Sequence, residues 1–241
     1  MLELIIAASL TTVATGIGAI PVILMGSRAE TLRPMLLGIA AGVMIVASCL
    51  GLIGPALDRG SLGQVAAGVA LGVVFLLGAR KFLSHGSKDS AGLNAGATSL
   101  LVFLVLFVHS LPEGFAIGTA YAEDPSTIGL FIVIAIAIQN IPEGTSVAIP
   151  LAANGASPTR QVLAAILSSV PQPIGAVIAF LLVGAISGLL PISFGFAAGA
   201  MLALSLIELV PQGFRAGPGL TIGGLLAGAA VMVVLDGLLG V

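Results

Sequence analysis

The sequence predicts an all-α membrane protein in which eight helices cross the bilayer. Of its 241 residues, 58% are hydrophobic, 7% are charged, and 33 are glycines, which let membrane helices approach closely. Soluble domains carry about 25% charged residues, so an ordinary soluble protein is excluded. Apolar stretches near the length that a spanning helix needs lie at 2–26, 35–57, 61–83, 98–121, 127–151, 160–186, 190–212 and 220–240. We therefore expect one transmembrane domain over 1–241.

The composition also excludes several classes of function. One Cys and two His exclude a disulfide framework and a zinc-finger array. A net charge of −2 without a basic face excludes nucleic acid as a partner. The sequence contains no G-x-x-x-x-G-K-[ST] motif, so we expect neither ATP-driven chemistry nor an organic cofactor.

Lys and Arg lie unevenly on the two sides of the predicted membrane. Only Arg59 falls in a loop after an even-numbered span. The loops after odd-numbered spans hold Arg28, Arg33, Arg80, Lys81, Lys88, Arg160 and Arg215. Because cytoplasmic loops are enriched in positive residues, these loops, including the long 84–97 link, are predicted to face the cytoplasm. Both termini then lie outside a plasma membrane, the inner membrane of a bacterium.

An internal repeat relates the two ends of the chain. GIAAGVMIVASCLGLI (38–53) matches GFAAGAMLALSLIELV (195–210) at an offset of 157 residues. The matching spans are five apart and so cross the membrane in opposite directions. The segments 1–83 and 160–241 are thus predicted to be inverted repeats around a central pair, 98–151. Inverted repeats are common in secondary transporters.

A shorter motif recurs within this central pair. The fourth span contains HSLPEG (109–114), and thirty residues later the fifth contains QNIPEG (139–144). Helical positions i and i+4 share a face, so His109 aligns with Glu113 and Gln139 with Glu143. Charged residues at the bilayer centre are unfavourable by about 2.5–3.5 kcal/mol or more, so they usually face a cavity and a partner.

Two such faces turned toward each other would supply an imidazole nitrogen, an amide oxygen and two carboxylates. This set suits Zn²⁺ and also Fe²⁺, Mn²⁺, Co²⁺ or Cd²⁺. Two carboxylates balance one divalent ion, and a neutral amide ligand favours its later release. Pro112 and Pro142 remove backbone donors and are expected to kink both helices at the site. The alternative is a pair of kinked helices whose glutamates are protonated or bonded to neighbours.

With these motifs the chain resembles the ZIP family of divalent-metal transporters, and the opening Gln of the second motif resembles its prokaryotic GufA-type branch. The resemblance covers essentially the whole chain. It implies a 3+2+3 helix arrangement, metal uptake toward the cytoplasm and, often, a homodimer. Carried over to this sequence, the metal site comprises His109, Glu113, Gln139 and Glu143. Met44 either approaches this site or packs in the core.

The resemblance also implies residues beside the first site. A second metal would use Ser110, Asn140 and Gln172, where relatives often have Asn, Asp and Glu. None of the three is a carboxylate here, so a second ion would lack balancing charge, and we expect one tight site beside a weak or empty one. Glu208 and Asp236 fall where relatives carry acidic residues on the metal's route.

The predicted function is therefore uptake of divalent metal ions, Zn²⁺ foremost, by alternating access. One alternative is a carrier of protons or another small solute that uses the intramembrane glutamates. An intramembrane metalloenzyme is a second, but the sequence has no HExxH motif and no obvious asymmetric base. A metal sensor or scaffold is a third, although the short loops offer little surface for partners.

Overall fold

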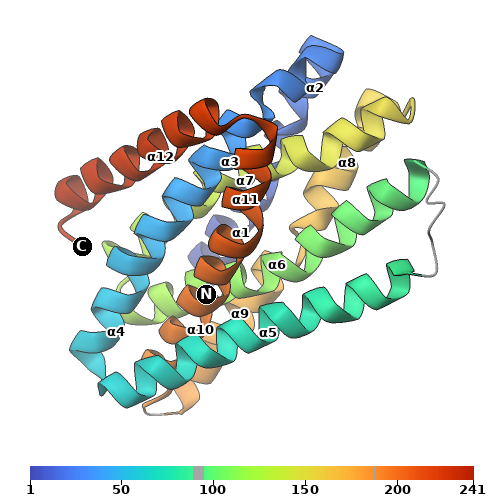
Figure 1. The fold of residues 1–241 in the computed structure, drawn as a ribbon. Helices are drawn as coiled ribbons and strands as arrows, with labels where there is room; N and C mark the ends of the chain where they lie inside the picture. The colour runs from blue at the N-terminus through green and yellow to red at the C-terminus, as the bar shows by residue number, and fades with distance from the viewer. Residues whose placement is uncertain (89–94, 187) are drawn as a thin grey trace.

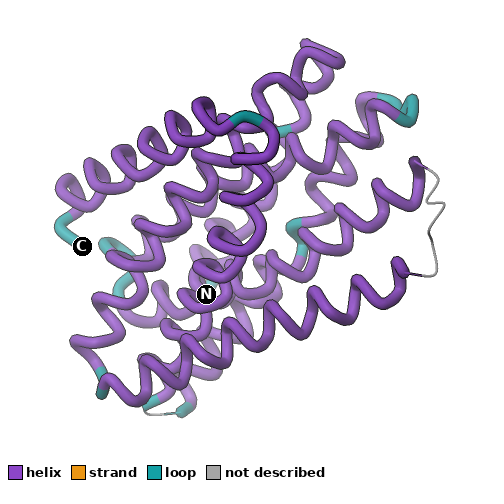
Figure 2. Tube along the Cα trace, in the orientation of Figure 1, coloured by secondary structure: helices purple, strands orange, loops and turns teal. Residues whose placement is uncertain are grey.

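A computed structural model describes residues 1–88, 95–186 and 188–241, and the regular elements in these residues are all helical (Figures 1 and 2). Within these residues, eight stretches are long and apolar enough to cross a membrane. The predicted fold class and number of spans are confirmed. The spans are Leu2–Met25, Ala29–Arg59, Leu62–Leu83, Val102–Glu123, Ile128–Ala153, Pro158–Ala185, Leu189–Ala216 and Pro218–Leu239.

Among the described residues, four of the eight spans are divided into shorter helices: the first, second, sixth and seventh. The elements are α1 (Leu2–Ile17), α2 (Ala19–Met25), a 3₁₀ turn (Gly26–Arg28), α3 (Ala29–Val46), a π-helical segment (Ala47–Ile53), α4 (Gly54–Arg59), α5 (Leu62–Lys88), α6 (Ala95–Glu123), α7 (Ile128–Ala153), α8 (Pro158–Ser168), α9 (Pro171–Ala185), α10 (Leu189–Leu204), a second π-helical segment (Ser205–Leu209), α11 (Val210–Ala216) and α12 (Pro218–Leu239).

Helices extend beyond the apolar stretches that predict them. The second span begins at Ala29 rather than at 35, and its first turns carry an ion pair between Glu30 and Arg33 at 3.0 Å. A search for apolar stretches does not detect polar helical turns of this kind. Helix also enters the predicted 84–97 loop from both sides, and residues 89–94 of that loop lie outside the described part of the chain.

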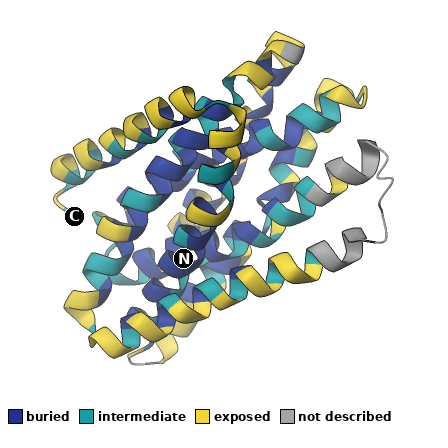
Figure 3. Ribbon diagram, in the orientation of Figure 1, coloured by how far each residue is buried: buried dark blue, intermediate teal, exposed yellow. Residues whose placement is uncertain are grey.

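The outer surface is apolar, as a bilayer requires. The third and eighth spans are the least buried of those described, and Figure 3 shows α12 largely exposed along its length. Leu71 on α5 is 56% exposed, and Leu226 on α12 is 62% exposed. Soluble monomers rarely expose apolar surface on this scale. The chain is therefore a multi-pass membrane protein.

Glycines bring the backbones of neighbouring helices together. α3 packs on α12, and α5 packs on α10. A side chain at Gly42 would overlap the backbone carbonyl of Leu225, and one at Gly199 would overlap that of Val69. Small residues at such crossings allow the close packing that holds membrane helices together.

The packing pattern recurs at the offset found in the sequence. Gly42 and Gly199 are 157 residues apart; Gly42 approaches α12 and Gly199 approaches α5, each the third span of the opposite predicted repeat. The two π-helical segments, Ala47–Ile53 and Ser205–Leu209, also overlap at this offset. In the centre, α6 packs on α9, α7 packs on α1, and α6 and α7 contact each other. The central pair therefore contacts helices from both ends of the chain.

Candidate metal site

The four predicted ligands are buried where α6 and α7 meet. His109 and Glu113 come from α6, and Gln139 and Glu143 come from α7. Nε2 of Gln139 donates a hydrogen bond to Oε1 of Glu113 over 2.6 Å. The carboxyl groups of Glu113 and Glu143 lie near each other. The structure thus brings the two motifs together.

The Pro-Glu-Gly sequences anchor this helix pair against its neighbours. A side chain at Gly114 would overlap the backbone carbonyl of Gln172 on α9, and one at Gly144 would overlap that of Thr15 on α1. Both α6 and α7 run through Pro112 and Pro142 as continuous helices. Each glutamate therefore lies one residue before a glycine at which a neighbouring helix contacts the helix that carries the glutamate.

Three atoms at this place are buried without a hydrogen-bond partner. Within the described residues they are Nδ1 of His109, Oε1 of Gln139 and Oε1 of Glu143. Leaving such a group unpaired is unfavourable by about 1–3 kcal/mol. Three different predicted ligands thus each carry a free nitrogen or oxygen of the kind that binds divalent transition metals.

The charged ligands alone do not form a ready-made site. Among the described residues, no group of three or more His, Cys, Asp or Glu side chains is placed to hold a metal ion. A metal ion bound here would therefore need the amide of Gln139 in addition to the charged ligands. For Gln139 to bind through its free oxygen, its hydrogen bond with Glu113 would have to be exchanged for that contact.

Two methionines lie beside the four predicted ligands. Met44 on α3 and Met201 on α10 are both buried, and they line one small void together with His109 and Glu113. The structure therefore places Met44 next to the site. Met201 was not predicted, although it is identical to Met44 across the 157-residue repeat, and that identity is a signal that would have found it.

The residues predicted to hold a second metal separate into two groups. Oε1 of Gln172 accepts a hydrogen bond from Nδ2 of Asn140 at 3.0 Å. The hydroxyl of Ser110 bonds instead to backbone, 3.0 Å from the carbonyl oxygen of Leu106 and 3.1 Å from that of Ser168. The structure therefore joins Asn140 to Gln172 and directs Ser110 toward α8.

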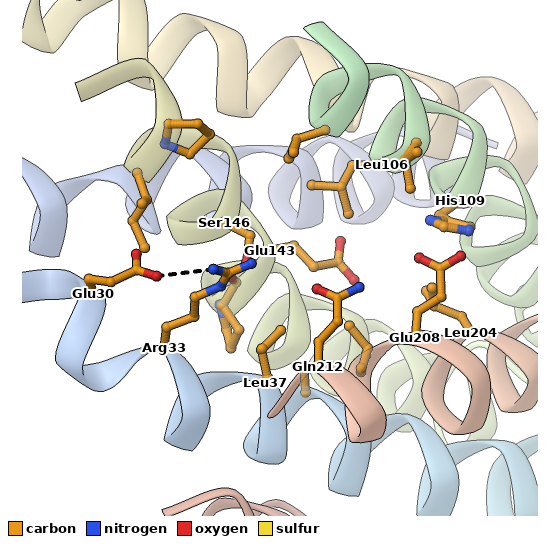
Figure 4. A pocket seen from close by; sticks show the side chains of 17 residues that line it. Glu30, Arg33, Leu37, Leu106, His109, Glu143, Ser146, Leu204, Glu208 and Gln212 are labelled. Atoms are coloured by element: carbon orange, nitrogen blue, oxygen red, sulfur yellow. Dashed lines mark hydrogen bonds and ion pairs between the residues drawn. The ribbon is translucent and has the colours of Figure 1, made fainter. Parts of the chain in front are cut away.

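A cavity of about 320 Å³ opens beside the site (Figure 4). Its lining reaches from His109 and Glu143 to Glu30 and Arg33, near the start of α3. Figure 4 shows the side chain of Glu208 close to that of His109 in this cavity. The cavity thus connects the buried ligands with one end of the helix bundle.

The two acidic residues predicted on the metal's route have different surroundings. Glu208 lines the cavity and forms a 3.7 Å ion pair with Arg80 of α5. Asp236 lies near the end of α12, half-buried, and the described lining of this cavity does not include it. Of the two, the structure places only Glu208 beside the central site.

Comparison with known sequences decides the family. The sequence model of a family described as ZIP Zinc transporter matches residues 79–236, more than half of the chain. The chain belongs to this family. The ZIP chain is 33% identical to Zinc transporter GufA of Myxococcus xanthus over 98% of both proteins. It is 35% identical to Zinc transporter ZIPB of Bordetella bronchiseptica, over 94% of the chain and 78% of that protein. A longer relative from Arabidopsis thaliana is 37% identical over 84% of the chain, a match that covers 33% of the relative.

The polar surroundings of this ZIP site include a residue that the sequence reasoning missed. Thr11 on α1 is fully buried, and its hydroxyl lies 2.8 Å from Oε1 of Gln172. Its signal was the spacing of Thr11 and Thr15, which share one face of an otherwise apolar span. Such threonines often bond to their own helix, so sequence alone did not single them out.

Proposed function

We propose that this ZIP protein carries divalent metal ions, Zn²⁺ foremost, across the plasma membrane into the cytoplasm. The transported ion would bind to His109, Glu113, Gln139 and Glu143. One observation carries this assignment: three of these side chains have a buried nitrogen or oxygen without a partner, among the described residues. The relatives named zinc transporters support the choice of ion. The chain is a transporter and not an enzyme.

The chemistry of the site suits a passing ion. Glu113 and Glu143 together balance the charge of one M²⁺ inside the membrane. The neutral amide of Gln139 is a weaker ligand than a third carboxylate, so the ion can leave again. Met44 and Met201 lie beside His109 and Glu113, where a thioether favours softer ions such as Cd²⁺ over Mg²⁺ or Ca²⁺.

We propose that the ion leaves through the cavity that ends at Glu30 and Arg33. The positive-inside rule assigns this end to the cytoplasm, which leaves both termini outside. Glu208 lies along this cavity and would receive the ion after the central site. Asp236 remains a predicted residue of the route, on the opposite side of the membrane. Nothing in the fold bears on the expected homodimer, which stays a prediction.

We propose alternating access by inverted repeats, 1–83 and 160–241, around the pair 98–151. The recurrence of glycine contacts and π-helical segments 157 residues apart supports this 3+2+3 arrangement. The transport site would then lie at the interface of the repeats, where such carriers bind their substrates. Motion of the enclosing helices would close the cavity and open the other side.

We propose one tight metal site. The neighbouring position holds the amides of Asn140 and Gln172, which are bonded to each other at 3.0 Å, and the Ser110 hydroxyl bonds to backbone carbonyls. A second ion would share Glu113 and Glu143 with no further carboxylate from these three residues. The second site is therefore weak or empty.

The test is metal entry into proteoliposomes loaded with a fluorescent indicator. We expect Zn²⁺ and Cd²⁺ to enter, with Fe²⁺ and Mn²⁺ compared, and entry to disappear in Glu143→Ala. Glu3→Gln, which removes an exposed carboxylate on α1, is the matched control and should transport normally. Equal entry in Glu143→Ala would move the pathway away from α7. No entry of any metal into vesicles with folded protein would favour the proton or solute carrier instead.

A further inference from the structure

A hydrogen-bonded cluster of uncharged residues contacts Glu113 through Gln172. It consists of Thr11 on α1, Asn140 on α7 and Gln172 on α9, all of them fully buried. It therefore joins helices from both ends of the chain to the central pair. The bilayer offers no water at this depth, so each donor in such a cluster must find its acceptor inside the protein.

The backbone of Thr11 sets the direction of the cluster. Its carbonyl oxygen accepts a 2.7 Å hydrogen bond from Asn140, and a carbonyl can only accept. The NH₂ group of Asn140 must therefore face Thr11. That same NH₂ group donates to Oε1 of Gln172 at 3.0 Å, so the oxygen of the Gln172 amide is directed toward Asn140 and Thr11.

The hydroxyl of Thr11 reinforces this orientation. It has two acceptors at 2.8 Å, the Ala8 carbonyl oxygen and Oε1 of Gln172. A flipped Gln172 would place its NH₂ against the NH₂ of Asn140 and its oxygen against Glu113. The first contact would set two donors against each other, and the second would be repulsive for an ionised Glu113. In the observed orientation of Gln172, its Oε1 can accept the hydroxyl hydrogen of Thr11.

The consequence reaches the metal site through Nε2 of Gln172. This atom donates to Oε2 of Glu113 over 2.6 Å and to Oδ1 of Asn140 over 3.2 Å. The other oxygen of Glu113, Oε1, accepts from Gln139. Gln139 is itself a proposed ligand and must release Glu113 when it turns to a metal. Gln172 is not one of the four proposed ligands, so its hydrogen bond to Oε2 is retained while Oε1 becomes available to the ion.

We propose that Thr11 is a positioning residue for metal binding: it orients the Gln172 amide so that this amide fixes Glu113 with one oxygen presented to the ion. The inference rests on the proposed function of the four ligands. The orientation has a second effect. On the side of Gln172, Glu113 faces an N–H group, and no amide oxygen is presented there as a ligand for a second ion. The cluster thereby directs Glu113 toward a single ion.

The test compares Zn²⁺ binding and Zn²⁺ uptake by Thr11→Val, Thr11→Ser and a matched control, Thr12→Val. Thr12 is also buried on α1, with its hydroxyl 3.1 Å from the Ala8 carbonyl oxygen and 3.2 Å from that of Ser169, so its loss reproduces the general effect of removing a buried hydroxyl. We expect Thr11→Val to weaken Zn²⁺ binding and raise the KM for uptake by about 3- to 10-fold, as loss of one hydrogen bond does. Its maximal rate per folded molecule should change less than its KM. Thr11→Ser should restore both values, and Thr12→Val should leave them unchanged.

A double-variant experiment tests the route through Gln172 and does not depend on Thr11→Val alone. Gln172→Met removes the donor to Glu113 and should weaken Zn²⁺ binding by itself. If Thr11 acts through Gln172, adding Thr11→Val to Gln172→Met should weaken binding no further. Additive losses, equal effects of Thr11→Val and Thr12→Val, or unchanged binding in Gln172→Met would each overturn the inference.

The outcomes also separate this inference from the proposed function. Wild-type protein must bind Zn²⁺, and Glu143→Ala must lose that binding. If both conditions hold while the Thr11 variants match the wild type, the inference alone fails. If the wild type binds no Zn²⁺, the proposed function fails and the inference fails with it.

Discussion

Gln139 and Glu113, two of the four predicted metal ligands, are hydrogen-bonded to each other, with Nε2 of Gln139 donating to Oε1 of Glu113 over 2.6 Å. The oxygen of the Gln139 amide is left buried without a partner, as judged within the described residues. If Gln139 binds the cation as proposed, binding would break one short hydrogen bond and satisfy one unpaired oxygen. The two changes would partly offset each other, as a site that fills and empties during transport requires.

Replacing Gln139 with histidine should make the site tighter and slower. A neutral imidazole is a better ligand for Zn²⁺ than an amide oxygen. Histidine also lacks the amide group of Gln139, whose hydrogen bond to Glu113 must break before the amide oxygen can bind the ion. We expect Gln139→His to tighten Zn²⁺ binding by about tenfold, equivalent to about 1.4 kcal/mol, and to lower the maximal uptake rate. Calorimetry and proteoliposome uptake measure the two effects. Unchanged affinity would argue that Gln139 does not contact the ion.

A carboxylate at position 172 should create a second metal site. Gln172→Glu replaces the donor that lies 2.6 Å from Oε2 of Glu113 with a carboxyl group, and two ionised carboxylates at this distance repel unless a metal ion or a shared proton lies between them. We expect the number of Zn²⁺ ions bound per chain to rise from one to two. Gln161→Glu, which alters a buried glutamine on α8, is the control and should leave the number at one. Two ions in the wild type would contradict the single-site proposal.

The close contact of α7 with α1 should not tolerate a side chain at Gly144. A methyl group there would overlap the backbone carbonyl of Thr15, and backbone atoms move only if the whole helix shifts. We expect Gly144→Ala to destabilise the protein by about 1–3 kcal/mol, the usual effect of overpacking. Thermal unfolding in detergent measures this.

Gly78→Ala provides the matched control for Gly144→Ala. Gly78 lies within α5, and nothing comes within 4 Å of an added methyl group. Alanine favours helix over glycine by up to about 1 kcal/mol, so this variant should be as stable as the wild type or slightly more stable. Equal melting temperatures for the two variants would show that α1 and α7 can move apart to accommodate the added methyl group at little cost in stability.

The turn between α6 and α7 should make stability depend on pH. Hydrogen bonds from the hydroxyl and N–H of Ser126, with further bonds from Thr127, hold the pKa of Asp124 below its usual range. A depressed pKa stabilises the fold above the unfolded pKa of about 3.9, and this contribution is lost as the pH falls through the folded pKa.

We therefore expect Asp124→Ala to melt below the wild type at neutral pH, with the difference shrinking as the pH falls below about 4. Asp58→Ala, which removes an exposed carboxylate on α4, is the comparison and should not reproduce this pattern. A difference that grows at low pH would have the wrong sign for a carboxylate held in its charged form.

The eight spans and the buried motif pair could be predicted from the sequence because both rest on local physics. A bilayer admits only long apolar helices, so composition and length identify the spans. The i, i+4 spacing within each motif is a property of any α-helix, so His109 and Glu113 share a face wherever the helix lies. The constant repeat offset likewise predicted related ends of the chain, and the recurring glycine contacts follow the same offset.

Only the tertiary structure decided which neighbours these residues meet. Thr11 lies 161 positions from Gln172 in sequence and 129 from Asn140, yet it bonds to both. Ser110 looked equivalent to Asn140 in the repeated motif, but its hydroxyl faces the backbone of α8. Helix periodicity sets the face that a residue occupies and says nothing of the helix packed against it. The sequence by itself therefore determined the membrane fold and the ligand types, and the packing of α1 and α9 decided how Glu113 is held.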